Sequence, residues 1–133
     1  MIEVYTDAGS AGNPGPSGAG IFIKNNGNII RESIPLLPMS NHEAEFHACL
    51  EALRICKKHE FSIISLRSDS KVLVESIERK YTKNPLFQPL LASILATMDH
   101  SFTYAFIKWI PSKQNKEADR LAKRAIQLAK KGS

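Results

Sequence analysis

The segment that follows Asp7 is so rich in glycine and proline that it predicts a turn between two structured elements. It reads Ala8-Gly9-Ser10-Ala11-Gly12-Asn13-Pro14-Gly15-Pro16-Ser17-Gly18, a composition that favours neither a helix nor a regular strand. The preceding residues 2–7 have the apolar and β-branched character of a strand, so Asp7 stands at the mouth of that strand. A carboxylate in this place adds little to a core, but it suits the binding of a cation.

Beyond this turn, the chain alternates between strand and helix patterns. A hairpin of strands over 19–24 and 29–35 is expected, because Asn25-Asn26-Gly27-Asn28 tolerates positive φ, and residues 36–39 are expected to be a connector. We predict further strands over 62–67 and 102–109, and helices over 42–58, 70–79, 85–98 and 115–130. This order predicts an α/β fold with a mixed sheet, in which the first three strands are antiparallel neighbours and helix-connected strands are parallel.

Local signals predict where two of these helices begin. Ser40 or Asn41 is expected to cap the helix over 42–58, and Pro85 is expected to stand in the first turn of the helix over 85–98. The residues between the predicted elements, 80–84 and 110–114, are expected to be loops.

Composition restricts the class of protein. With 133 residues, the chain is long enough for one domain with a core, which we expect to span residues 1–133. No apolar stretch approaches the roughly 20 residues that cross a bilayer, and no signal-peptide pattern is visible, so no membrane association and a cytoplasmic location are expected. Cys49 and Cys56 lie about 10 Å apart on a helix, too far for a disulfide, and are expected to be buried and reduced.

The balance of charge favours a polyanionic partner. The formal net charge is +5, and it becomes more positive over the rest of the surface if several carboxylates are gathered at one metal site. A solvated helix face is the alternative explanation for the basic residues near the C-terminus, which are Lys116, Arg120, Lys123, Arg124, Lys130 and Lys131.

Glu45 is the anomaly of the helix predicted over 42–58. Counting by three and four from Glu45 gives Cys49, Ala52 and Cys56, an apolar stripe that should pack on the sheet. A carboxylate at the start of such a stripe is costly to bury unless it is paired or bound to a metal. The alternative is a partly exposed glutamate in the first turn, which the helix dipole favours.

Two further carboxylates occupy helix starts. Asp69 follows the apolar run 63–66, and Asp119 borders the buried face of the last helix; each has a simple alternative explanation, as a helix cap or as a favourable charge near the helix N-terminus. If the fold brings these carboxylates to one edge with Asp7 and Glu45, oxygen ligands alone would select Mg²⁺ or Mn²⁺. The histidines form no ligand-like pair and are interpreted as surface or packing residues: His42, His47, His59 and His100.

Four motifs follow one another along the chain: Tyr5-Thr6-Asp7 with the glycine-rich turn; Asn41-His42-Glu43-Ala44-Glu45; Ser68-Asp69-Ser70; and Asn115-Lys116-Glu117-Ala118-Asp119. In this order, and over nearly the whole chain, they resemble the type 1 ribonuclease H family. The resemblance implies a ribonuclease H-like fold with a five-stranded mixed sheet flanked by helices. It also implies an endonuclease that hydrolyses RNA paired with DNA and leaves 5′-phosphate and 3′-hydroxyl ends.

The same resemblance implies the residues of the site. Two Mg²⁺ ions, for which Mn²⁺ may substitute, would be held by Asp7, Glu45, Asp69 and Asp119. The partner would be an RNA–DNA hybrid, bound by a monomer through its backbone shape and 2′-hydroxyl groups. The implied substrate contacts are Asn13, Ser40, Asn41, Lys71, Lys113 and Asn115.

Two departures from the family pattern leave alternatives open. Many bacterial members carry a histidine in the loop before the last helix, whereas residues 110–114 contain none and resemble the shorter archaeal-type loop, with Lys113 as a partial substitute. The basic handle is also missing, and only Arg79, Lys80 and Lys83 occupy that turn. A binding module with little or no catalysis is therefore the alternative to the nuclease. A third hypothesis keeps the chemistry but changes the substrate to single strands or a DNA joint.

Overall fold

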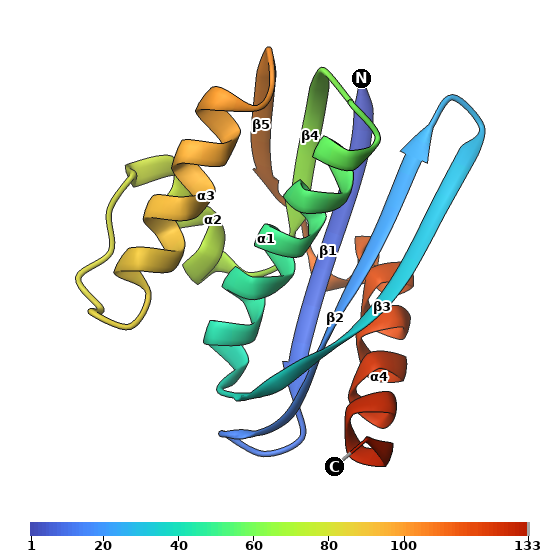
Figure 1. The fold of residues 1–133 in the computed structure, drawn as a ribbon, viewed down its shortest axis with the longest axis vertical. Coiled ribbons are helices and arrows are strands. Elements are labelled where there is room, and N and C mark those ends of the chain that lie inside the picture. Colours follow the sequence, from blue (N-terminus) through green and yellow to red (C-terminus); the bar gives the residue numbers. More distant parts are fainter. Residues whose placement is uncertain (133) are drawn as a thin grey trace.

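Five strands form one mixed sheet in the order β3-β2-β1-β4-β5 (Figure 1). The computed structural model describes residues 1–132. The strands are β1 (Ile2–Ser10), β2 (Gly15–Asn25), β3 (Asn28–Met39), β4 (Ile63–Ser68) and β5 (Tyr104–Trp109). β1, β2 and β3 are antiparallel neighbours, while β1 pairs with β4 and β4 with β5 in parallel, so the predicted fold class is confirmed.

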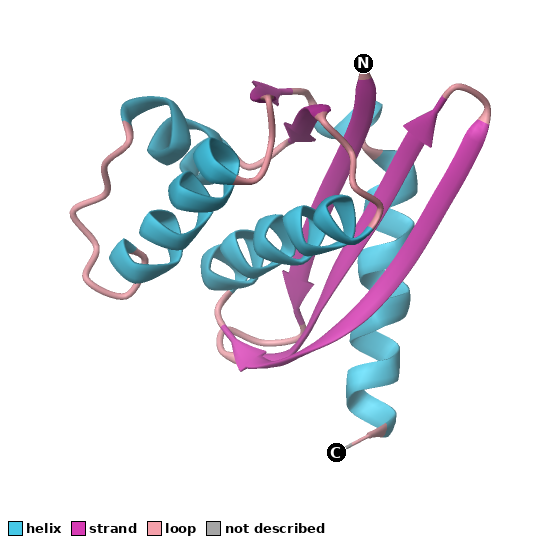
Figure 2. Ribbon diagram, turned by 45° about the horizontal axis from the view of Figure 1, so that its top comes forward, coloured by secondary structure: helices cyan, strands magenta, loops and turns pink. Residues whose placement is uncertain are grey.

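Helices cover both faces of this sheet (Figure 2). They are α1 (Asn41–Lys58), α2 (Lys71–Arg79), α3 (Gln88–His100) and α4 (Lys116–Lys131), with a short 3₁₀ turn η1 (Ser112–Gln114) before α4. α1, α2 and α3 lie on one face, and α4 lies alone on the other (Figures 1 and 2). No helix within residues 1–132 is long and apolar enough to cross a membrane.

The main core lies between the sheet and α1. Val4, Ile21, Ile23 and Ile64 point from alternate strand positions towards this side and are fully buried. The stripe predicted on α1 is confirmed, because Cys49, Ala52 and Cys56 are all buried there. Both cysteines are free thiols, as predicted.

α4 lies unusually close to β2, because two glycines of that strand leave room for its backbone. A Cβ atom at Gly20 would lie 2.1 Å from the carbonyl oxygen of Ala118, and one at Gly18 would lie 2.5 Å from the Cβ of Ala125. These contacts fix the start of α4 over the strand position opposite Asp7, since Gly20 pairs with Asp7.

The glycine- and proline-rich segment is less of a turn than predicted. β1 continues to Ser10 and β2 already begins at Gly15, because Gly9 pairs with Gly18 and Ser10 with Ser17. Local composition disfavours strand here, but the cross-strand hydrogen bonds outweigh it. Residues 36–39 are likewise part of β3 rather than a connector, since β3 stays paired with β2 as far as Met39.

Helix starts were predicted with mixed success. Ser40 caps α1 as expected, its Oγ accepting the main-chain N–H of Glu43 at 3.3 Å. The third helix begins at Gln88 rather than at residue 85, so the proline of its first turn is Pro89 and not Pro85. Pro85 lies instead in the turn over 85–87 that precedes the helix, because the Oδ1 of Asn84 accepts the N–H of Leu86 and closes a local turn.

Candidate active site

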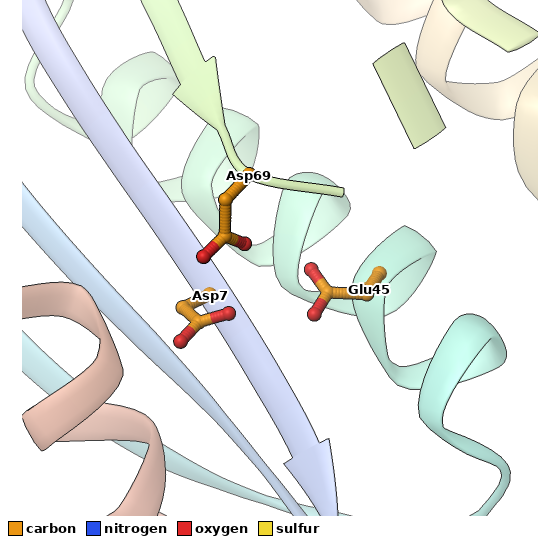
Figure 3. Close-up of side chains that lie close together, drawn as sticks. All are labelled: Asp7, Glu45 and Asp69. Carbon is orange, nitrogen blue, oxygen red and sulfur yellow. The ribbon is translucent and has the colours of Figure 1, made fainter. Parts of the chain in front are cut away.

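Three carboxylates from distant parts of the chain meet beside β1 and the end of β4 (Figure 3). Asp7 lies within β1 rather than at its mouth, because the strand stays paired as far as Ser10. Asp69 directly follows β4, and Glu45 reaches the same place from the first turns of α1. One carboxylate oxygen of each lies within 4.8 Å of the others. The parallel pairing of β1 with β4 brings the two aspartates together, and the connection through α1 places Glu45 beside them.

Burial and mutual repulsion disfavour the ionised forms of two of these groups. Burial, and then the charge of Asp69, raises the pKa of Asp7 to about 8. Burial, and then the charges of Asp7 and Asp69, raises the pKa of Glu45 well above its ordinary value. Both carboxyls accept from the main-chain N–H of Ala8, which lowers their pKa but does not offset the burial.

A divalent cation fits this arrangement. The Oε2 of Glu45 is buried and has no hydrogen-bond partner within the described residues, although buried carboxylate oxygens are normally satisfied. A bound cation would satisfy it and offset the burial and the repulsion that raise the pKa values of Asp7 and Glu45. Because every donor is an oxygen, the set suits Mg²⁺ or Mn²⁺ rather than zinc or copper.

Asp119 lies beside this cluster without joining it. It stands in the first turn of α4, is about half exposed, and pairs with the Nζ of Lys123 at 3.0 Å. It is near enough that a hydrogen bond and its charge both help to raise the pKa of Asp7. Its place among the metal ligands stays a prediction.

The predicted substrate residues near α1 are joined through hydrogen bonds. The Oδ1 of Asn13 accepts the main-chain N–H of Asn41 at 3.1 Å, and the Oδ1 of Asn41 accepts that of Ser10 at 2.9 Å. These bonds tie the turn over 11–14 to the start of α1, next to Ser40. Asn13 and Asn41 are both exposed.

Asn115 differs from the other predicted contacts. It is 1% exposed, and its Nδ2 donates to the main-chain carbonyl of Thr6 at 2.8 Å. Its Oδ1 is buried without a partner among the described residues. Asn115 therefore joins the start of α4 to β1 one residue before Asp7.

Lys71 borders the site at the start of α2, and Lys113 lies on η1 next to Ser112, which lines the hollow in front of Glu45 and Asp69. Lys71, the first residue of α2, lies 5.3 Å from the centre of the Trp109 ring and also lines the hollow in front of Glu45 and Asp69. Lys113 is exposed on η1.

Two residues at the site were not found from the sequence. His42, interpreted there as a surface or packing residue, lines the hollow in front of Glu45 and Asp69. Its position three residues before Glu45, almost one helical turn, was the available signal. Trp109 donates from its Nε1 to the main-chain carbonyl of Asp69 at 3.2 Å, a contact that no sequence pattern indicated.

Comparison with known proteins assigns the family. The fold and the carboxylate cluster define the class of ribonuclease H-like proteins, and residues 6–125 match the family model described as "Reverse transcriptase-like". The chain is 41% identical over 129 residues to "Putative hydrolase EbsB" of Enterococcus faecalis, covering 96% of this chain and 95% of that one. It is 30% identical over 150 residues to the ribonuclease H of Mesorhizobium japonicum, covering 100% of this chain and 82% of that one.

Solved structures agree with this assignment. LC11-RNase H1 in complex with an RNA/DNA hybrid superposes with a TM-score of 0.89 at 29% identity, covering 97% of this chain and 99% of that one. RNase H1 of Halobacterium salinarum gives a TM-score of 0.88 at 26% identity, with coverage of 95% and 97%. The chain therefore belongs to the reverse transcriptase-like family and, within it, to the type 1 ribonuclease H family of nuclease enzymes, which confirms the resemblance found in the sequence.

Proposed function

We propose that this protein is an endonuclease that hydrolyses the RNA strand of RNA–DNA hybrids and leaves 5′-phosphate and 3′-hydroxyl ends. The observation that carries the proposal is the cluster of Asp7, Glu45 and Asp69, whose oxygens lie within 4.8 Å of one another in a member of this family. The solved complex of LC11-RNase H1 with an RNA/DNA hybrid supports the substrate.

The metal would be held by Asp7, Glu45 and Asp69, with Asp119 as a further ligand of a two-ion site. Bound Mg²⁺ ions supply an activated water and neutralise charge on the leaving oxygen of a phosphodiester. The protein contributes a rigid frame for the ligands, because two of them extend from paired strands and the third from a helix packed on the sheet. The partnerless Oε2 of Glu45 supports this role.

Substrate binding would use the borders of this site. Asn13, Asn41 and Ser40 surround the start of α1, where small polar groups suit the backbone of a duplex read by shape and 2′-hydroxyls. Lys71 and Lys113 would contact phosphates at the border formed by α2 and η1. Asn115 would act mainly by holding α4 against β1, because its amide is already bonded to Thr6.

A test of this function compares labelled substrates under three metal conditions. The wild-type protein should cut a uniform RNA–DNA hybrid with Mg²⁺ or Mn²⁺ and leave it intact with chelator. Asp69→Asn should abolish cleavage but keep most of the binding. Duplex RNA, duplex DNA and single strands should stay uncut. The RNA fragments released from the hybrid should be substrates for a ligase that requires a 5′-phosphate end. A hybrid that stays uncut with both metals would refute the nuclease proposal.

A hybrid-binding module with little catalysis is the second candidate. The loop before α4 lacks a histidine, and the link over 80–87 between α2 and α3 carries only Lys80 and Lys83 as basic residues. Steeply salt-dependent binding to the hybrid without cleavage would favour this candidate. We also propose that the protein acts as a monomer in the cytoplasm; its two buried free thiols are compatible with a reducing compartment.

A further inference from the structure

One part of the sheet face that carries α4 has no helix over it. α4 covers Gly18 and Gly20 of β2. The helix begins over Gly20, and the strands extend beyond its first turn, where no helix covers them (Figure 1). Side chains that alternate onto this face beyond α4 come from four strands and define what we call the open face: Tyr5, Phe22, Lys24, Arg67, Phe106 and Lys108. They differ from an ordinary polar surface because aromatic rings and cations lie side by side.

Cations and rings form one row across all five strands. The register pairs Arg31 with Phe22, Phe22 with Tyr5, Tyr5 with Arg67, and Arg67 with Lys108. The guanidinium of Arg31 lies 5.4 Å from the centre of the Phe22 ring, and that of Arg67 lies 5.5 Å from the Tyr5 ring. The Tyr5 and Phe22 ring centres are 5.8 Å apart. These contacts hold both guanidinium groups in place.

The charge of this surface is mainly positive. Among Lys24, Arg31, Arg67 and Lys108 lies one carboxylate of the sheet, that of Glu3, and Asp7 lies farther along β1 on the same face. Glu3 pairs with the Nη1 of Arg67 at 3.1 Å, and Arg31 pairs with Glu117 of α4 at 3.2 Å. Lys24 and Lys108 are exposed at the two ends of the aromatic surface, so an anionic chain crossing it would meet a cation at either end.

Two rings stand exposed on the edge strand, Phe106 of the open face and its neighbour Tyr104. Tyr104 and Phe106 of β5 are 59% and 47% exposed and stack on each other, with ring centres 6.0 Å apart and planes inclined by 15°. Phe106 lies beside Ser65 and Tyr104 beside Ile63, both on the same face, so Tyr104 extends the open face along β5. Exposed stacked rings next to cations are the combination with which proteins bind unpaired bases and the phosphates between them.

We propose that the open face binds single-stranded nucleic acid, with bases on Tyr104 and Phe106 and phosphates on Lys24 and Lys108. Asp7 lies two residues beyond Tyr5 on the same strand and the same face, about 7 Å along β1. A single strand bound on the open face would therefore run towards the carboxylate cluster. It would be the unpaired extension of a nucleic acid held at that cluster. A second copy of this chain fits less well, because a two-fold contact would bring the positive surface against itself.

The experiment measures binding without cleavage. Fluorescence anisotropy of a labelled thymidine oligonucleotide, with chelator present, should show saturable binding by the wild-type protein. Tyr104→Ala with Phe106→Ala should weaken binding at least tenfold, the loss expected for one or two base–aromatic stacks. Lys24→Gln with Lys108→Gln should lower the salt dependence of log Kd by about 0.7 for each lysine.

Matched controls lie away from the open face. Tyr81→Ala removes an exposed ring from the link between α2 and α3, and Lys57→Gln with Lys58→Gln removes two charges from the end of α1; both should leave Kd within about twofold. An RNA oligonucleotide of matched length shows whether RNA or DNA is preferred, and binding of either supports the proposal. Unchanged thermal unfolding shows that each variant is folded. If the Tyr104→Ala, Phe106→Ala variant does not fold, the Lys24→Gln, Lys108→Gln variant still tests the proposal.

Three outcomes would overturn the proposal. They are no binding of either strand at low salt, equal weakening by the control variants, and a concentration-dependent dimer that Tyr104→Ala with Phe106→Ala abolishes. Because binding is measured without metal, loss of hydrolysis in the hybrid assay does not affect this result. The two proposals can therefore fail separately.

Discussion

The side-chain amide of Asn115 donates to the main-chain carbonyl of Thr6 at 2.8 Å, across 109 residues of sequence. Both residues are buried, and Thr6 precedes Asp7 while Asn115 precedes the helix that carries Asp119. This hydrogen bond therefore sets the distance between β1 and the start of α4. It makes Asn115 a positioning residue for Asp119, the predicted fourth ligand.

Asn115→Ala should destabilise the fold by about 1–3 kcal/mol, because it leaves the buried carbonyl of Thr6 without its donor. Urea unfolding of the metal-free protein measures the loss. Gln127→Ala, at an exposed position of the same helix, is the control and should change stability by less than about 0.5 kcal/mol. Equal stability of Asn115→Ala and wild type would show that the hydrogen bond contributes nothing.

Gly20→Ala should be far more damaging than Gly9→Ala. The added Cβ at Gly20 would lie 2.1 Å from the Ala118 carbonyl, which is helix backbone and cannot move alone. At Gly9 the nearest atom is the Cδ1 of Ile126 at 3.1 Å, the end of a flexible side chain. We expect a loss of about 1–3 kcal/mol or more at Gly20 and less than about 1 kcal/mol at Gly9, measured by urea unfolding. Hybrid cleavage should fall with Gly20→Ala because α4 moves away from Asp7.

The element order and part of the site could be predicted from the sequence because both depend on local periodicity. The apolar stripe on α1 identified Glu45 as a carboxylate with a buried neighbourhood, and the structure places it beside Asp7 and Asp69. The features that the sequence did not predict depend on tertiary contacts. Nothing local indicates that Asn115 is buried, or that cross-strand pairing carries β1 on to Ser10 through a glycine-rich segment.

Without metal, the protein should lose stability as pH rises from about 4 to 8. The pKa of Asp7 is about 8 in the folded protein, above its ordinary value of 3.8, so folding retains a proton that the unfolded chain releases over this range. Each retained proton lowers stability by up to about 1.4 kcal/mol per pH unit. Thermal unfolding with chelator measures the slope, and Asp7→Asn should flatten it. A stability that rises with pH over this range would contradict the raised pKa that burial and then the charge of Asp69 give to Asp7.

Divalent cations should remove the loss of stability that the metal-free protein shows as pH rises. Mg²⁺ or Mn²⁺ binds the ionised carboxylates of the folded protein, so it should raise the unfolding temperature more at pH 8 than at pH 5, where protons compete. Glu45→Gln should weaken this stabilisation, since it replaces the carboxylate whose Oε2 has no partner within the described residues. Glu51→Gln, on the half-buried outer side of the same helix, should not. Stabilisation that is the same in wild type and Glu45→Gln would place the cation elsewhere.

The only tryptophan of the chain should report on the site. Trp109 donates to the carbonyl of Asp69 and lies 5.3 Å from Lys71, so a cation that moves the Asp69 segment changes the surroundings of its indole. Titration with Mn²⁺ or Mg²⁺ should change the tryptophan fluorescence to saturation, and Asp69→Asn should weaken that response at least tenfold. Trp109→Phe replaces the indole with a smaller aromatic ring that has no N–H donor. It should reduce hybrid cleavage several-fold while changing stability by less than about 1 kcal/mol, as expected for a residue that positions Asp69. Full cleavage activity in Trp109→Phe would show that the Asp69 segment is held without the indole.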